Sequence, residues 1–171
     1  LFAGLINMQI MSAFEKMEGG LLTFVLFFVP LITGMSGNIG IQCSTILVRS
    51  MALGLISPSN QKEALKKELL VGTFSGVVFG VLCGIIIFLI DVVSGGSLGV
   101  SPLPLGVIIG TGLIGACFFG TFLGIFSPMF FSKIGIDPAV ASGPIVAAFN
   151  DVLSMIIYFA ISWGLASIFF T

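Results

Sequence analysis

Long stretches without a charged residue limit most strongly what this chain can fold into. Residues 21–48 contain no Asp, Glu, Lys or Arg, and further apolar runs recur along the whole length. A helix needs about 20 predominantly apolar residues to cross a bilayer. Charged residues make up only 8% of the chain, against about 25% in soluble globular domains. Because the runs are continuously apolar rather than alternating, as a transmembrane β-barrel would require, we predict an all-α membrane protein.

Charges, prolines and glycine clusters divide the chain into five hydrophobic segments, which we predict to be the transmembrane helices of a single domain, residues 1–171. The expected spans are residues 1–14, 21–55, 69–90, 103–131 and 139–170. The second has a polar centre, and the fourth is longer than a span requires, so it must tilt, kink or project. The chain opens without an initiator methionine or the basic segment of a signal peptide. We expect it to be a piece of a longer protein, with its first span truncated.

The basic residues indicate how the spans cross the membrane. One side of the predicted bundle carries five of the six basic residues: Arg49, Lys62, Lys66, Lys67 and Lys133. Lys16 is the exception. Because basic residues gather in cytoplasmic loops, we expect a multi-pass protein of the cell (inner) membrane, with its N-terminus in the cytoplasm and its C-terminus outside.

Glycines four residues apart recur in the third and fourth predicted spans. They are Gly76, Gly80 and Gly84, then Gly106 and Gly110, then Gly120 and Gly124. Small residues at this spacing let two helix backbones approach closely in lipid, where no hydrophobic effect drives association. We therefore predict that these glycines pack the helices into a compact bundle.

The absence of histidine excludes several kinds of active site. A Ser/His dyad, a zinc site of the H-E-x-x-H kind and histidine-ligated haem all need a residue that the chain lacks. Cys43, Cys83 and Cys117 stand singly in separate apolar segments, without the paired spacing of a metal or disulfide framework. An intramembrane aspartyl protease would need two deep carboxylates, and only one acid lies deep in a span. We therefore do not expect an enzyme.

Asp151 is the acid that lies deep in a predicted span. It follows Asp137 by fourteen residues, or about 20 Å along a helix, and a carboxylate inside the hydrocarbon layer marks an ion or substrate pathway by default. Asp91 and Asp137 fall at helix ends and are predicted to be capping or interfacial residues. A salt bridge with Arg49 is the alternative for Asp151, although the two residues differ in depth by about 10–15 Å.

The polar centre of the second span, TGMSGNIGIQC, indicates where an ion would meet the backbone. Gly34, Gly37 and Gly40, with Ser36 and Asn38, allow the backbone to leave helical geometry. The freed carbonyl oxygens would be tolerated in a water-filled cavity. Carbonyls, amides and one carboxylate are hard oxygen ligands suited to Mg²⁺ or Ca²⁺. Because Mg²⁺ loses its water reluctantly, we expect a site that recognises a largely hydrated ion.

One carboxylate leaves a divalent cation half compensated. Two copies of Asp151 meeting at a two-fold axis through the pore would supply two negative charges at one depth, and two-fold dimers are the commonest oligomers. We therefore predict a homodimer whose ion pathway lies near its axis. The other expected partners are membrane lipid and divalent cations, and no nucleic acid.

Two segments, PLITGMSGNIGIQCSTILVRSMALG and IDPAVASGPIVAAFNDVLSMIIYF, resemble the signature segments of the MgtE magnesium channel family, and the resemblance extends over nearly the whole chain. It implies a five-helix domain that dimerises, with a pore formed mainly by the second and fifth helices. It also implies an ion site that uses Asp151 with backbone carbonyls of Gly34 and Ala147. Ile41 and Gly143 stand at positions that can be polar in the family, so secondary ion contacts need not occur there.

The predicted function is a dimeric Mg²⁺ channel driven by the membrane potential, with a mid-membrane metal site of Asp151, Ala147, Gly34, Gly37 and Asn38. A secondary transporter of Mg²⁺ or other divalent cations, coupled to Na⁺ or H⁺, is the alternative, because broken helices are common in transporters. Selectivity among Mg²⁺, Co²⁺, Mn²⁺ and Ca²⁺ stays open, since all of these ions accept oxygen ligands. We expect the full-length protein to carry cytoplasmic regulatory domains, which are absent from this chain.

Overall fold

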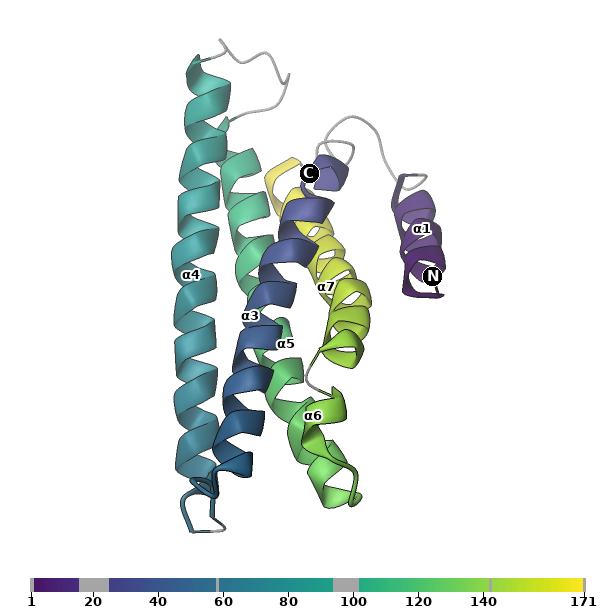
Figure 1. The fold of residues 1–171 in the computed structure, drawn as a ribbon. Coiled ribbons are helices and arrows are strands. Elements are labelled where there is room, and N and C mark those ends of the chain that lie inside the picture. The colour runs from purple at the N-terminus through teal and green to yellow at the C-terminus, as the bar shows by residue number, and fades with distance from the viewer. Residues whose placement is uncertain (1, 16–24, 58, 94–101, 142, 171) are drawn as a thin grey trace.

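The computed structural model describes residues 2–15, 25–57, 59–93, 102–141 and 143–170 (Figure 1). The helices are α1 (Phe2–Glu15), α3 (Val29–Ala52), α4 (Gln61–Val93), α5 (Pro102–Lys133), α6 (Pro138–Ala141) and α7 (Pro144–Phe170). No strand occurs within these ranges, which confirms the predicted all-α class. Among the described residues, four helices, α3, α4, α5 and α7, are long and apolar enough to cross a membrane. The helix α1 has 14 residues, or about 21 Å, so a fifth span stays a prediction.

The helix α5 lies at the centre of the bundle. The helices α3, α4 and α7 all pack against it, α3 also contacts α7, and α1 contacts α7. In Figure 1, α5 crosses behind α3 while α4 forms one side of the bundle. The fully buried side chains of α5 include Leu105, Ile108, Ile109, Leu113, Ala116 and Cys117. By contrast, α4 exposes apolar side chains along much of its length, as expected of a helix that faces lipid.

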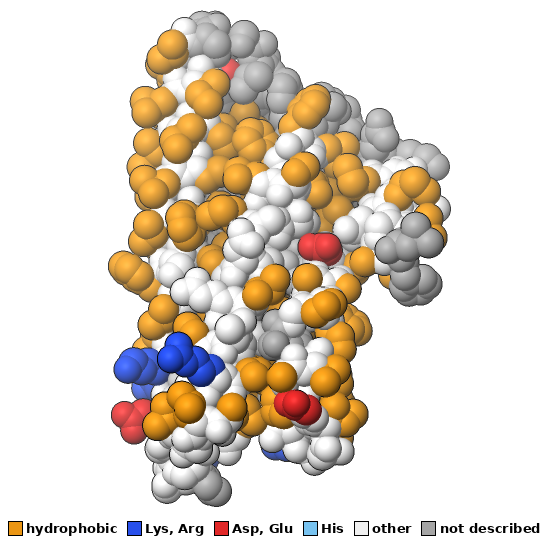
Figure 2. Space-filling model, viewed as in Figure 1, with side chains coloured by type: hydrophobic (Ala, Val, Ile, Leu, Met, Phe, Trp, Pro, Cys, Tyr) orange, Lys and Arg blue, Asp and Glu red, His pale blue; other side chains and the backbone are white. Residues whose placement is uncertain are grey.

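The basic residues predicted to share one side do lie at one end of the bundle. The connections from α3 to α4 and from α5 to α6 are both at this end (Figure 1). Arg49 lies in the last turn of α3, and Lys133 ends α5. Figure 2 shows Lys and Arg side chains gathered at this end of the visible face, below a surface that is mainly hydrophobic. We call it the basic end.

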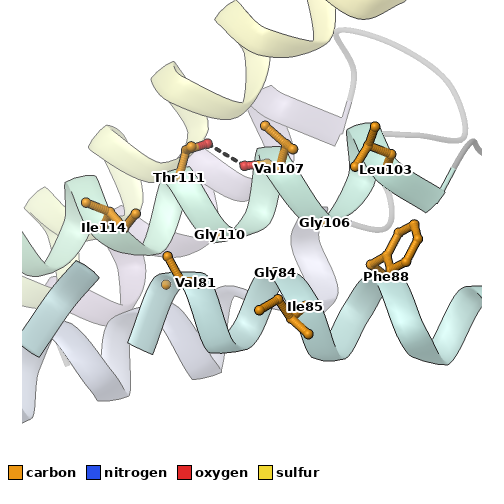
Figure 3. Close-up of a pocket in the computed structure, with 11 residues that line it drawn as sticks. Val81, Gly84, Ile85, Phe88, Leu103, Gly106, Val107, Gly110, Thr111 and Ile114 are labelled. Carbon is orange, nitrogen blue, oxygen red and sulfur yellow. Dashed lines mark hydrogen bonds between the residues drawn. The ribbon is translucent and has the colours of Figure 1, made fainter. Parts of the chain in front are cut away.

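A seam of glycines joins α4 to α5. A Cβ atom on Gly80 would lie 2.7 Å from the carbonyl oxygen of Gly110, and one on Gly84 would lie 2.8 Å from that of Gly106. These distances leave no room for a side chain, so the predicted role of these glycines in close packing is confirmed. An apolar groove of about 320 Å³ runs beside the seam and is open on one side (Figure 3).

A second seam joins α3 to α5. A Cβ atom on Gly40 would lie 2.7 Å from the carbonyl oxygen of Gly120, and one on Gly124 would collide with the carbonyl oxygen of Gly40. The two glycine pairs of α5 therefore serve different neighbours. The pair nearer its start contacts α4, and the pair nearer its end contacts α3.

The predicted departure of the second span from helical geometry is wrong. The helix α3 runs without interruption from Val29 to Ala52, through all the glycines of its polar centre. Gly37 and Gly40 are buried and allow the neighbouring helices to approach, so their role is packing rather than backbone freedom. The chain turns instead at Phe28, and Pro30 follows in the first turn of the helix, where its missing N–H and fixed φ are tolerated.

The predicted fifth span is divided in two. The helix α6 ends at Ala141 and α7 begins at Pro144, which is a favoured residue at the first position of a helix. Asp151 therefore lies seven residues, about 10 Å, from the start of α7. The prediction that one continuous helix leads from Asp137 to Asp151 is therefore wrong. Figure 1 shows that α7 begins near mid-height of the bundle, with α6 between it and the basic end.

Candidate functional site

Asn150 lies where α3, α5 and α7 meet. Its side chain is 1% exposed. Its Nδ2 atom donates a hydrogen bond to Ser36 Oγ at 3.0 Å and approaches the carbonyl oxygen of Thr33 at 3.5 Å. The Ser36 hydroxyl donates in turn to the Thr33 carbonyl at 3.2 Å. The bond between Asn150 and Ser36 joins α7 to α3 inside the bundle. It also gives the Asn150 amide the partner that a polar group inside a membrane needs.

Glycines form the walls around this bond. A Cβ atom on Gly37 would lie 3.3 Å from Asn150 Nδ2. One on Gly120 would lie 2.7 Å from Asn150 Oδ1 and 2.6 Å from the carbonyl oxygen of Ser36. Within the described part of the chain, Asn150 Oδ1 has no hydrogen-bond partner. We call these four residues, Ser36, Gly37, Gly120 and Asn150, the junction.

Asp151 follows Asn150 directly, so the junction sets its height in the bundle. Because Asn150 contacts Ser36, Asp151 lies level with residues 33–37 of α3. Ser36 is about 10 Å from the first residue of α3 and about 24 Å from the last, which places the carboxylate within the span. The Asp151 side chain is half-buried, and Ala147 lies one turn earlier on the same side of α7.

The structure does not contain the alternative salt bridge between Asp151 and Arg49. Arg49 follows Ser36 by thirteen residues, or about 20 Å along α3, so it lies far from the height of Asp151. Among the residues that the structure describes, no hydrogen bond or ion pair joins Asp151 to another group. The carboxylate is therefore left available for a ligand.

The outer face of α3 carries a continuous line of small and polar residues. Its exposed members follow one another at intervals of four, four, three and four residues: Gly34, Asn38, Gln42, Thr45 and Arg49. This spacing keeps them on one side of an α-helix. The buried face, which includes Ser36 and Gly40, lies on the opposite side. We call the exposed line the polar stripe.

The predicted site residues fall into three groups. Gly34 and Asn38 lie in the polar stripe, Gly37 lies in the junction, and Ala147 and Asp151 lie half-buried on α7. The described ranges contain no group of three or more His, Cys, Asp or Glu residues that could hold a metal ion. Any ion site here must therefore draw on carbonyl or amide oxygens, or on water.

Three polar residues of this region were not predicted from the sequence. Gln42 and Thr45 could have been found, because their spacing from Asn38 continues one face of a helix. Asn150 gave no such signal, since its partner Ser36 is 114 residues away in the chain.

Asp137, near the basic end, has a structural role. Asp137 Oδ1 accepts a hydrogen bond from the backbone N–H of Ala139 at 2.9 Å, at the start of α6. This contact is that of a helix-capping residue, so the predicted capping role of Asp137 is confirmed. Asp91 lies near the end of α4, and its side chain is buried.

The spans, the junction and the polar stripe together define a multi-pass helical membrane protein with a polar site between its helices. The family model described as "MgtE: Divalent cation transporter" matches residues 29–161. The chain therefore belongs to the MgtE family, as its two signature segments predicted.

Curated relatives agree with this assignment. The chain is 33% identical over 164 residues to "Magnesium transporter MgtE" of Enterococcus faecalis and 31% identical over 162 residues to the protein of the same name in Bacillus subtilis. A third relative of that name, from Thermus thermophilus, is 28% identical over 162 residues. Each match covers 95% of this chain and 34% of the relative. The chain thus spans about a third of the length of these proteins.

Proposed function

We propose that the chain is the membrane-spanning part of a magnesium channel. The relatives that match it are named magnesium transporters, and each match covers 95% of this chain, whose described residues include four candidate membrane spans. The observation that carries the proposal is the polar stripe on α3, which reaches the height of Asp151 on the neighbouring helix α7. The proposal of a channel, rather than a coupled transporter, goes beyond what the names of the relatives say.

A stripe of this kind is poorly suited to contact with lipid. Exposed amides and hydroxyls at membrane depth raise the free energy of the folded protein unless water or protein groups form hydrogen bonds with them. From Gly34 to Arg49 the stripe extends over sixteen residues, or about 22 Å, which is most of the roughly 30 Å hydrocarbon thickness. A water-filled pathway along the stripe would hydrate its side chains and give ions a route through the membrane.

Asp151 and its neighbours would form the ion site in this pathway. The carboxylate supplies negative charge, and Asn38 supplies an amide one turn beyond Gly34. The carbonyls of Ala147 and Gly34 lie within continuous helices, so each would offer the lone pair that its helical hydrogen bond leaves free. Such ligands suit Mg²⁺, which keeps several of its waters when bound. A site that contacts the ion through its water shell needs few direct ligands, in keeping with the single acid. Gly37 would support this site through its place in the junction.

A second copy of the chain would complete the pathway. One Asp151 balances half the charge of a divalent cation, and the polar stripe is exposed on the single chain. A two-fold dimer that brings two stripes together would bury both around a shared water-filled axis and place two carboxylates at one height. The basic end would then face the cytoplasm of the cell, with the N-terminus inside and the C-terminus outside.

Ion flux into proteoliposomes tests the proposal. With an inside-negative potential and no Na⁺ or H⁺ gradient, we expect Mg²⁺ to enter vesicles that contain the intact protein, at a rate that rises with the potential. Uptake that begins only when a Na⁺ or H⁺ gradient is added would replace the channel with the coupled transporter. Absence of uptake under both conditions would contradict Mg²⁺ transport itself.

A further inference from the structure

We propose that Asn150 is a positioning residue for the ion site. Through its bond to Ser36, Asn150 fixes the rotation of α7 about its axis and thereby the direction in which Asp151 points. This inference rests on the proposed function, since it assigns Asn150 a role in ion binding by Asp151. It concerns a residue that makes no contact with the ion itself.

The geometry of α7 ties the direction of Asp151 to that of Asn150. Successive residues of an α-helix are about 100° apart around its axis. Because Asn150 points into the contact among α3, α5 and α7, Asp151 must lie to one side of that contact, where its side chain is half-buried. A rotation of α7 large enough to move Asp151 away would break the bond between Asn150 and Ser36.

Among the described residues, Asp151 has no anchor of its own. No hydrogen bond or ion pair with another described residue holds its carboxylate. The nearest fixed polar group along the helix is Asn150, whose amide is held by an oxygen of α3 at 3.0 Å. The position of the carboxylate therefore depends on a backbone that its neighbour holds in place.

Packing alone does not explain an amide at position 150. Asn150 is buried, yet Oδ1 has no hydrogen-bond partner among the described residues. A buried polar atom without a partner destabilises a fold, and an apolar side chain of similar size would avoid that cost. The glycines at positions 37 and 120 leave space for this amide but little more. The advantage of Asn150 over an apolar side chain is therefore its directed hydrogen bond to Ser36.

The dependence of Mg²⁺ uptake on Mg²⁺ concentration separates positioning from structural support. In the intact protein, we expect Asn150→Leu and Ser36→Ala each to raise the half-saturating Mg²⁺ concentration about tenfold, as the loss of a residue that orients a metal ligand does. The maximal rate per folded protein should change little. Ser154→Ala is the matched control, because Ser154 is equally buried on α7 but its hydroxyl bonds only the Asn150 carbonyl of the same helix, at 2.6 Å.

A loss of folded protein or of maximal rate with an unchanged half-saturating concentration would overturn the positioning role. If Asn150→Leu does not fold, Ser36→Ala decides the question alone, because it removes the acceptor on α3 and otherwise only a bond of Ser36 to the Thr33 carbonyl of its own helix. In an Asp151→Asn background, Ser36→Ala should not lower the residual Mg²⁺ uptake further, since both changes act through one carboxylate. A further severalfold loss of uptake in that background would show that Ser36 and Asn150 act independently of Asp151, against the proposal.

Two outcomes distinguish this inference from the proposed function. If Asp151→Asn abolishes uptake but Ser36→Ala and Asn150→Leu leave the half-saturating Mg²⁺ concentration unchanged, the ion site stands and the positioning role fails. If the protein shows no uptake, the rate at which a charged thiol reagent modifies Asp151→Cys, in a background without native cysteines, still tests the position of this residue. Adding Ser36→Ala should change that rate severalfold and adding Ser154→Ala should not, and equal rates in all three proteins would overturn the proposal.

Discussion

Tyr158 on α7 donates a hydrogen bond from its hydroxyl to the backbone carbonyl of Val25, at 2.9 Å, just before α3 begins. The Tyr158 side chain is fully buried. Together with the bond between Asn150 and Ser36, it gives α7 a second polar link near the start of α3. The two links start from residues eight positions apart, or about 12 Å along α7, so they fix both the position and the rotation of this helix.

Removing the Tyr158 hydroxyl should destabilise the bundle. We expect Tyr158→Phe to lower the free energy of unfolding by about 1 kcal/mol, the range found for single interhelical hydrogen bonds in membranes. Reversible unfolding of the purified protein in lipid micelles measures this loss. Ser75→Ala serves as the control, because the Ser75 hydroxyl bonds only to the Val71 carbonyl of its own helix. Equal stability of Tyr158→Phe and the parent would mean that the link to Val25 does not hold α7.

Any side chain at Gly120 should disturb the junction. A Cβ atom there would meet the Ser36 carbonyl and the Asn150 amide at 2.6 and 2.7 Å. Since one of these atoms belongs to the backbone, a helix must shift. We expect Gly120→Ala to cost about 1–3 kcal/mol of stability, the usual cost of overpacking. Gly164→Ala, where nothing lies within 4 Å, should be neutral or stabilising by up to about 1 kcal/mol. Similar melting temperatures for the two variants would contradict this account of the junction.

The polar stripe should be accessible to water. In a background without the native cysteines, we expect a charged thiol reagent to modify Gln42→Cys at least about tenfold faster than Val78→Cys, because thiolates form and react readily only where water reaches them. Both positions are exposed on the single chain, but Val78 lies on the apolar face of α4. Comparable rates at the two positions would show that the stripe does not line a water-filled pathway.

The class of fold could be predicted because membrane helices are specified by local composition. Long apolar runs identify the spans, and the glycine spacing predicted the close contacts of Gly80 and Gly84 with α5. The capping role of Asp137 was also predictable, since capping depends on residues adjacent in sequence. These features needed no knowledge of which helices are neighbours.

The errors arose where one local pattern allows two structures. Glycines in a span permit either a break or close packing, and only the position of α5 decides that Gly40 serves packing. The helix α6 ends at Ala141 and α7 begins at Pro144. Proline is favoured at the first position of a helix, but Pro138 could begin a helix equally well, so the sequence alone did not locate the break. Asn150 was missed because its role comes from Ser36, on a helix distant in sequence.

Comparison of Asp151→Asn with Asp137→Asn tests the central claim most directly. Both substitutions remove one negative charge and keep the size of the side chain, but Asp137 caps α6 near the basic end, whereas Asp151 lies level with residues 33–37 within the span. We expect Mg²⁺ uptake into proteoliposomes under an inside-negative potential to collapse for Asp151→Asn and to stay near the parental rate for Asp137→Asn. Parental uptake by Asp151→Asn would show that the carboxylate is not part of the ion pathway, and the proposed site would be wrong.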